Sequence, residues 1–472
     1  MKYVSDPSDT LWERLPFRRL VGGGTALATK TLPLPFTSAY DPPMEGEGRL
    51  DPLGLGQIAD RIADSYARPV RARMKRIRFL TAMALGGKIA PELMDVTPAV
   101  AGDTPEIAFE RVVIESLARA GSGGLQLDTG IPGITKAQAA LMGNLRLDAR
   151  GYLKTPKVFG FSGVYRPLAT ATHLLDSNGG TLPAGESLLE GLYHDARRNS
   201  EFESDPSSSE FLEWITQATA DGLREGRNTF RKKSPHVQSL AMIAGPQLAG
   251  PKERSALSQV LHSPDSAGHV EDEAAYLEVL ALIPQAPEEL GSEVDWVDYL
   301  RAQGSEGLRA RMNMLITFED FGRDLLWGFE TYRFLSSQAF GHIPADDLVA
   351  TDEVLTSVAQ SVADRYRTTL AAMERASDFG VDVDISARFT SSFADFDRPM
   401  NSLELLDTLM LHHSEVQKAK PPMGKRPWLE SVNGHWACRP LFSIKEPVER
   451  RTSYIHPYRF DTLVRFLADV HE

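Results

Sequence analysis

Helical periodicity in the middle of the chain limits its possible folds more than any other feature. From Phe211 to about Asp378, apolar residues recur every three or four positions. The clearest runs are 211–223, 272–282, 308–335 and 352–376. This spacing places apolar side chains on one side of a helix, which then packs through that side. The sequence therefore predicts a mainly α-helical protein.

The length of 472 residues exceeds what one hydrophobic core normally organises, so we expect a multidomain chain. The acidic, serine-rich segment 201–210 has the composition of a linker or exposed loop. Glycines and prolines interrupt residues 1–50 too often for long helices to persist. The expected parts are an irregular N-terminal arm (1–50), a helical domain (51–200), a helical domain with an acidic middle (201–400) and a basic C-terminal segment (401–472).

Composition limits the cellular compartments and the classes of protein that fit this chain. The formal charge of −13 argues against a protein coated in basic residues, so any contact with nucleic acid must be local. Cys438 is the single cysteine, which excludes an internal disulfide and a multi-cysteine zinc site and fits a reducing compartment. The sequence contains neither a signal-peptide core nor an apolar run of about 18 residues. We expect a cytoplasmic protein without membrane spans.

A basic run is the strongest functional signal. Six of the eleven residues from Arg68 to Arg78 are basic. Their spacing predicts a helix in which four cations share one face and apolar residues occupy the opposite arc. The four are Arg68, Arg71, Lys75 and Arg78. Cations at this spacing can reach several phosphates at once, which predicts contact with DNA or RNA. The alternative is a solvated helix face whose arginines pair with acids elsewhere in the fold.

A second basic region lies between Lys418 and Arg459, and its candidates for nucleic-acid contact are Lys425, Arg426, Trp428 and Arg439. Tryptophan among cations can stack on a base, but it can equally anchor the segment to the core. Residues 255–300, by contrast, contain ten acids and no lysine or arginine. That stretch would repel nucleic acid and is a candidate surface for a partner protein.

The region near residues 100–180 has the order of a winged-helix module with a small β component. Thr104, Pro105 and Glu106 predict the start of a helix that ends at Gly121. A short helix from Lys136 to Met142 follows, and 152–164 mixes aromatic, β-branched and glycine residues as a hairpin or wing would. Short helices separated by glycine also occur in many helical proteins that do not bind DNA.

Catalytic candidates are few. Two aspartate pairs, Asp382 with Asp384 and Asp395 with Asp397, could ligate Mg²⁺ in a metal-dependent nuclease or phosphohydrolase, although a solvated loop is the simpler interpretation. Histidines gather near the C-terminal segment, but their spacing does not suit zinc. No catalytic residue, cofactor or metal is therefore nominated, and whether the chain is an enzyme stays open, with a non-enzyme favoured.

Three passages carry a family resemblance. They read LDPLGLGQIADRIADSYARPVRARMKRIRFLTAMAL, then KVFGFSGVYRPLATATHLLD, then HHSEVQKAKPPMGKRPWLE together with YIHPYRFDTLVRFL. These passages resemble uncharacterised bacterial accessory proteins that are encoded beside helicases and nucleases in anti-phage defence islands. The resemblance implies an accessory or DNA-engaging subunit of a multi-protein defence system, and it supplies no active-site residues.

The sequence as a whole favours a non-catalytic nucleic-acid-binding or scaffold subunit of such a system, with DNA and other protein subunits as partners. A metal-dependent nuclease or phosphohydrolase with dispersed ligands is the first alternative. A structural subunit that binds only protein is the second.

Overall fold

The computed structural model describes residues 51–471, except for 128–129, 232–233, 246–248, 264–269, 339–343, 345, 421–423 and 433–434. Within these residues the chain forms 18 α-helices and one two-stranded antiparallel sheet. The predicted mainly α-helical class is confirmed. The arm expected over residues 1–50 lies outside the described residues.

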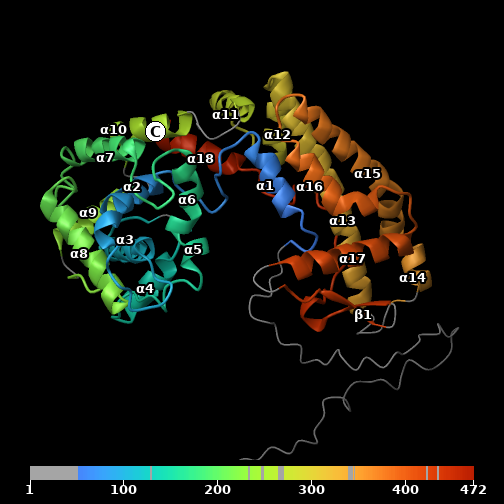
Figure 1. The fold of residues 1–472 in the computed structure, drawn as a ribbon, viewed down its shortest axis with the longest axis horizontal. Coiled ribbons are helices and arrows are strands. Elements are labelled where there is room, and N and C mark those ends of the chain that lie inside the picture. Colours follow the sequence, from blue (N-terminus) through green and yellow to red (C-terminus); the bar gives the residue numbers. More distant parts are fainter. Residues whose placement is uncertain are drawn as a thin grey trace, which may run out of the picture.

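The helices form two lobes that are joined along one margin (Figure 1). The first lobe contains α2 (Phe79–Ile89), α3 (Pro105–Ser122), α4 (Ile134–Met142), α5 (Pro156–Phe159), α6 (Phe161–Ala171), α7 (Pro183–Ala196), α8 (Ser209–Glu225), α9 (Pro235–Ala244) and α10 (Pro251–His262). The second lobe contains α1 (Gly56–Asp64), α12 (Glu293–Gln303), α13 (Glu306–Gln338), α14 (Asp346–Thr351), α15 (Glu353–Ser377), α16 (Asp384–Phe393), α17 (Ser402–Ala419), β1 (Leu429–Val432) and β2 (His435–Cys438). Short 3-10 turns are η2 (Ala90–Leu93), η3 (Ile283–Gln285), η4 (Ala394–Phe396) and η5 (Pro440–Phe442).

Three segments bridge the lobes. Helix α11 (Val270–Leu282) lies above the junction, α18 (Phe460–His471) contacts both α10 and α12, and residues 65–78 run from α1 into α2. Residues 201–208, where a boundary was expected, connect α7 to α8, and α8 and α9 both pack on α3.

The second lobe is built around α13, which packs along α15. Both helices were expected from the apolar runs at 308–335 and 352–376. Phe321 is at the centre of the core, where its ring contacts Phe389 at 5.2 Å and Phe393 at 5.3 Å between centroids. Asp352 caps α15 by accepting a hydrogen bond from the Leu355 amide at 2.9 Å. The hairpin pairs Leu429 with Cys438 and covers one end of α13 and α17.

In the first lobe α3 is central and is contacted by α4, α6, α8 and α9. Its predicted start is confirmed, because the Thr104 hydroxyl accepts a hydrogen bond from the Ile107 amide. Helix α4 also lies where a second short helix was expected. Three charged residues of α3 are fully buried, and each has an internal partner. Among them, Arg111 pairs with Asp103 at 2.6 Å.

The wing is the part of the predicted module that is wrong. Residues 152–164 form turns, the short helix α5 and the start of α6, and they contain no strand. Phe161, Val164, Tyr165 and Leu168 of α6 are buried at the spacing i, i+3, i+4, i+7, which is a helical pattern rather than the alternation of a hairpin. The phenol of Tyr152 binds buried Glu110 instead of joining a sheet. In its described part the first lobe has two isolated β-bridges but no β-strand, so it lacks the wing of a winged helix.

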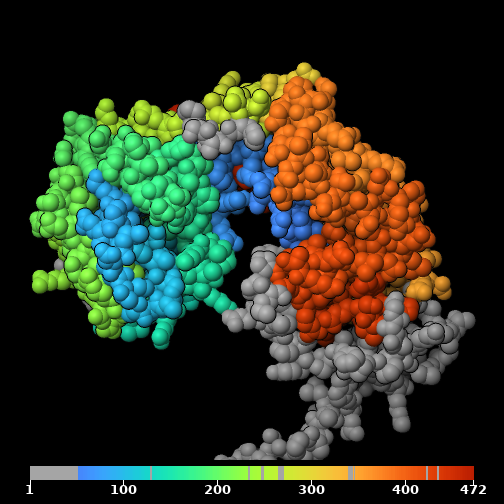
Figure 2. All heavy atoms as spheres, in the orientation of Figure 1, coloured from blue at the N-terminus to red at the C-terminus, as the bar shows by residue number. Residues whose placement is uncertain are grey.

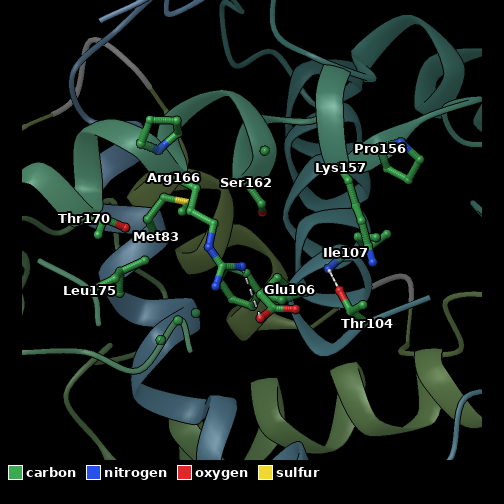
Figure 3. Close-up of a pocket in the computed structure, with 16 residues that line it drawn as sticks. Met83, Thr104, Glu106, Ile107, Pro156, Lys157, Ser162, Arg166, Thr170 and Leu175 are labelled. Carbon is green, nitrogen blue, oxygen red and sulfur yellow. Dashed lines mark hydrogen bonds and ion pairs between the residues drawn. The ribbon is translucent and has the colours of Figure 1, made fainter. Parts of the chain in front are cut away.

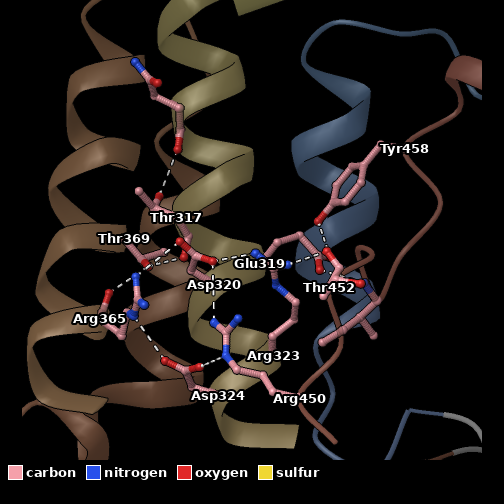
Figure 4. A network of polar contacts seen from close by, with 12 residues as sticks. Thr317, Glu319, Asp320, Arg323, Asp324, Arg365, Thr369, Arg450, Thr452 and Tyr458 are labelled. Carbon is pink, nitrogen blue, oxygen red and sulfur yellow. Dashed lines mark hydrogen bonds and ion pairs between the residues drawn. The ribbon is translucent and has the colours of Figure 1, made fainter. Parts of the chain in front are cut away.

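Part of the C-terminal segment, residues 450–458, binds to acids of α13 (Figure 4). Arg450 Nε donates to Asp324 Oδ1 at 2.6 Å, and Arg365 of α15 reaches both Asp320 and Asp324. Buried Glu319 accepts hydrogen bonds from the Ile455 amide at 2.7 Å and the Tyr458 hydroxyl at 2.8 Å. These partly exposed cations and the backbone bonds to Glu319 hold the C-terminal segment against α13.

The sequence predicted no membrane-spanning segment. In the described part of the chain, no helix combines the length and the apolar character needed to cross a bilayer.

Candidate nucleic-acid interface

A gap separates the two lobes on the side opposite the bridge, and Figure 2 shows it as an open hollow between them. The loop between α1 and α2, residues 65–78, forms the upper border of this inter-lobe gap (Figures 1 and 2). Helix α5 faces it from the first lobe, and α1 faces it from the second. The strongest sequence candidate thus lies where an extended ligand could approach.

The basic run is not the helix that its spacing predicted. Residues 65–78 form turns, and α2 begins only at Phe79. Pro69 lies directly after Arg68 and disfavours a helical conformation there. The apolar residues Val70, Met74 and Ile77 are fully buried, as a helix would also have placed them. The prediction of one cationic face is therefore wrong, because the cations divide into buried and outward-facing groups.

Arg78 and Arg68 belong to the buried group. The Arg78 guanidinium forms a two-point ion pair with Glu253 of α10, with Nε–Oε1 at 3.0 Å and Nη2–Oε2 at 2.8 Å. Its Nη1 donates to the carbonyls of Met242 and Gly245, both at 2.7 Å. Arg68 pairs with Glu273 of α11 at 2.8 Å, and its guanidinium lies 4.7 Å from the centre of the Tyr276 ring. Because both guanidinium groups are paired inside the fold, neither presents a charge to a phosphate.

Arg71, Arg73 and Lys75 belong to the outward-facing group, which we call the loop cations. Arg71 pairs with Asp60 of α1, and both side chains are largely solvated. Arg73 is exposed and rests on the ring of Phe159 in α5, 4.5 Å from its centre. Lys75 is half-buried and its methylene groups pass over Gly130. A partly solvated cation keeps most of its attraction for a polyanion at a modest cost in lost ion pairing.

The second predicted group follows the C-terminal end of α17, a segment that also borders the gap (Figure 1). Lys420 Nζ donates to the Asp51 carbonyl at 2.7 Å, which places the C-terminal end of α17 beside the chain that enters α1 (Figure 1). Lys418 is exposed there, and Lys425 and Arg426 are half-buried. Arg426 pairs with Glu430 at 2.8 Å. We call Lys418, Lys425 and Arg426 the α17-end cations.

Trp428 and Arg439 are placed differently from the prediction. Trp428 is 3% exposed and stacks on Phe442, with ring centres 4.9 Å apart and an angle of 6° between planes. Its backbone amide donates to His413 Nε2 at 2.8 Å. Arg439 is 1% exposed and donates to the Pro427 carbonyl. The anchoring role of Trp428, the alternative left open by the sequence, is the one that the structure shows, and stacking on a base by Trp428 is not possible in this arrangement.

The metal candidates do not converge. Asp382 and Asp384 lie at the start of α16, whereas Asp395 and Asp397 lie in and after η4, beyond its end. Ten helical residues separate the pairs by roughly 15 Å, too far for one cation to bind both. Asp384 pairs with Arg388 and Asp397 with Arg367. Among the residues that the structure describes, no group of three potential ligands could hold a metal ion.

The histidines of the C-terminal region have structural roles. His413 Nδ1 donates to the Pro52 carbonyl at 2.8 Å while Nε2 accepts from Trp428, so the ring is neutral. Burial lowers the pKa of His413 to about 4, an effect that the hydrogen bond to Pro52 opposes in part. His412 Nε2 lies 2.8 Å from the Leu53 carbonyl. Both rings thus attach α17 to the chain that leads into α1.

Sequence reasoning did not nominate Arg73 or Lys418 as site residues. Arg73 was outside the helical face that the spacing suggested, and Lys418 was counted only as part of the basic C-terminal region. The charge run itself could have included both, but the side on which each cation lies depends on the turns at 65–78 and the end of α17.

Comparisons with protein-family models, with curated proteins and with solved structures gave no match. Function must therefore be inferred from the geometry of this chain.

Proposed function

We propose that this chain is a cytoplasmic, non-catalytic subunit that binds nucleic acid along the inter-lobe gap and acts as a scaffold in a bacterial multi-protein system of the anti-phage defence kind. The proposal rests on one observation: two basic segments meet at the same inter-lobe gap. The loop 65–78 and the C-terminal end of α17, which carry these two groups of cations, are far apart in the sequence, yet both segments border the same gap. A phosphate backbone passing between the lobes would meet both groups, and their combined charge would favour it.

The distribution of acids supports the scaffold role. Helices α11 and α12 lie along the margin away from the gap and carry most of the acids of the stretch 255–300 (Figure 1). Glu273 and Asp272 are used internally, by Arg68 and Arg311. Asp295 and Asp298 remain exposed. Nucleic acid would be repelled from this outer margin, which leaves it open to a protein partner with a basic surface.

The test measures binding of short labelled DNA and RNA, single- and double-stranded, across a salt series. Two charge-reversal variants are needed: Arg73→Glu with Lys75→Glu, and Lys418→Glu with Lys425→Glu. The matched control, Arg224→Glu with Lys252→Glu, makes the same change in net charge at exposed positions on α8 and α10. We expect each test variant to weaken binding about tenfold or more and to reduce the slope of log Kd against log salt by about 2. The control should bind as the wild type does.

Three results would overturn the proposal. Equal weakening in the control would mean that overall charge, and not the gap, governs binding. Failure of the wild-type chain to bind any of the four nucleic acids would leave a protein-only scaffold, which partners that co-purify after nuclease treatment would identify. Cleavage of the labelled strands in Mg²⁺ or Mn²⁺ would show an enzyme.

A further inference from the structure

The first lobe contains a cavity of about 660 Å³ that is separate from the cations of the gap (Figure 3). It lies between α2, the beginning of α3 and the helix pair α5–α6. Its volume is within the range of sites that hold small organic molecules. The sequence did not predict a binding site here, because the cavity walls come from separate segments that only the fold brings together.

The walls are mainly apolar and closely packed. Met83, Ile107, Phe109 and Leu175 contribute carbon surface. Gly86 of α2 also lines the cavity, and a Cβ atom there would come within 2.9 Å of the Phe109 ring. The α2 backbone and the Phe109 ring are therefore in close contact at this part of the wall. An apolar ligand would find a preformed surface.

Three charged side chains line the cavity. Arg166 extends from α6 toward Glu106 at the start of α3, and Lys157 projects from α5 (Figure 3). The Arg166–Glu106 pair is loose, with Nη1–Oε1 at 3.8 Å, although Arg166 Nη2 also donates to the Ser177 carbonyl at 2.8 Å. Two cations and one carboxylate give the lining a net charge of +1. A guanidinium has five N–H donors, so Arg166 retains donors for a ligand.

Pro167 adds an acceptor to the same wall. It lies inside α6 and has no N–H, so the carbonyl of Gly163, four residues earlier, lacks its normal helical partner. Both residues line the cavity. The site thus offers carbon surface for most of a ligand and a few polar groups that could fix its orientation, the usual design of a small-molecule site.

We propose that this cavity binds a small organic monoanion with an apolar body of roughly ten carbon atoms, whose carboxylate pairs with Arg166 and Lys157. The carboxylate would replace the loose contact between Arg166 and Glu106, and the net positive lining would favour one negative charge over none. A cationic ligand would meet two like charges. This proposal does not depend on nucleic-acid binding.

The experiment titrates the full chain with decanoate, decanol and decyltrimethylammonium by calorimetry, below their micelle concentrations. Hydrogen exchange with bound decanoate locates the site. Arg166→Gln removes the cation, and Thr170→Trp places a large ring at the exposed rim of the cavity without entering the core. Arg224→Gln on α8 is the control. We expect decanoate to bind at least about tenfold more tightly than decanol in the wild type, and Arg166→Gln to remove that preference.

The Thr170→Trp variant should weaken the binding of decanoate and of decanol to the same extent. This variant keeps the proposal testable if Arg166→Gln fails to fold. Decanoate should protect amides of residues 105–109 and 161–170. The proposal is overturned if none of the three compounds binds, if decanol or the ammonium compound binds as tightly as decanoate, or if protection appears elsewhere.

Discussion

Replacing Arg78 with methionine should destabilise the first lobe severely, by about 3–5 kcal/mol. The side chains of Arg78 and Glu253 are 2% and 0% exposed, and they form two parallel hydrogen bonds. Removal of the guanidinium leaves the Glu253 carboxylate buried, with the Thr81 hydroxyl as its remaining side-chain donor at 2.7 Å. The carbonyls of Met242 and Gly245 lose a donor as well. An uncompensated buried charge is the largest of these costs.

A second substitution separates the charge from the packing. In the double variant Arg78→Met with Glu253→Leu, no unpaired charge remains, although the two carbonyls and Thr81 still lack their partners. We expect the double variant to recover at least about 2 kcal/mol of the loss. If the single and double variants were equally unstable, the lost carbonyl bonds would dominate and the charge argument would be wrong.

Hydrogen exchange is the suitable assay, because it reports the opening free energy of α2 and α10 separately from the second lobe. The control is Arg224→Met, which breaks an exposed pair with Asp221 and should cost less than about 1 kcal/mol. An Arg78→Met effect no larger than that of the control would refute the view that Arg78 holds α2 against α10. The result also bears on function, since any charge reversal at Arg78 would report folding rather than loss of nucleic-acid binding.

Three further predictions concern single contacts. The pKa of His413 is about 4 in the folded chain and about 6.5 when the chain is unfolded, so the unfolded chain takes up the proton first as the pH falls. The free energy of unfolding, measured with urea, should therefore fall by up to ~3 kcal/mol between pH 6.5 and pH 4. His413→Gln should lose this pH dependence. Glu319→Gln should cost about 2–3 kcal/mol and speed hydrogen exchange over 450–459, because Tyr458 and the Ile455 amide lose a charged acceptor; unchanged exchange would contradict it. Gly133→Ala should lower the midpoint of thermal unfolding, because φ at Gly133 is +79° and a Cβ there would approach Tyr152 Cε2 to 2.2 Å. The expected loss of stability is about 1–3 kcal/mol. An unchanged midpoint would show that the turn relaxes freely.

Local signals predicted the helices well. Thr104 with Pro105 marked a helix start because capping is decided within a few residues. The apolar spacing through α13 and α15 predicted two long helices, since a periodic stretch of that length has few alternatives. The wing failed because aromatic and β-branched composition suggested strand pairing, while the spacing of Phe161 onward was that of a helix.

The candidate interface was predicted only in part. Arg68 and Arg78 looked identical to Arg71 in the sequence, yet their acids, Glu273 and Glu253, come from segments about two hundred residues away. Spacing cannot show such partners. Trp428 presented the same difficulty, because its stacking partner Phe442 and the His413 that accepts its amide are set by tertiary packing. The cavity beside Arg166 had no sequence signal at all.

The connection between α1 and α18 has a consequence for synthesis on the ribosome. The Tyr66 hydroxyl donates to the Tyr458 carbonyl, 392 positions later, and Arg459 binds the carbonyls of Ala67 and Arg68. These early residues must wait for almost the whole chain to be translated before their partners exist. Contacts of such long range are slow to form. During most of translation the first lobe therefore lacks the second lobe as a packing partner. We expect the gap between the lobes to form late in folding.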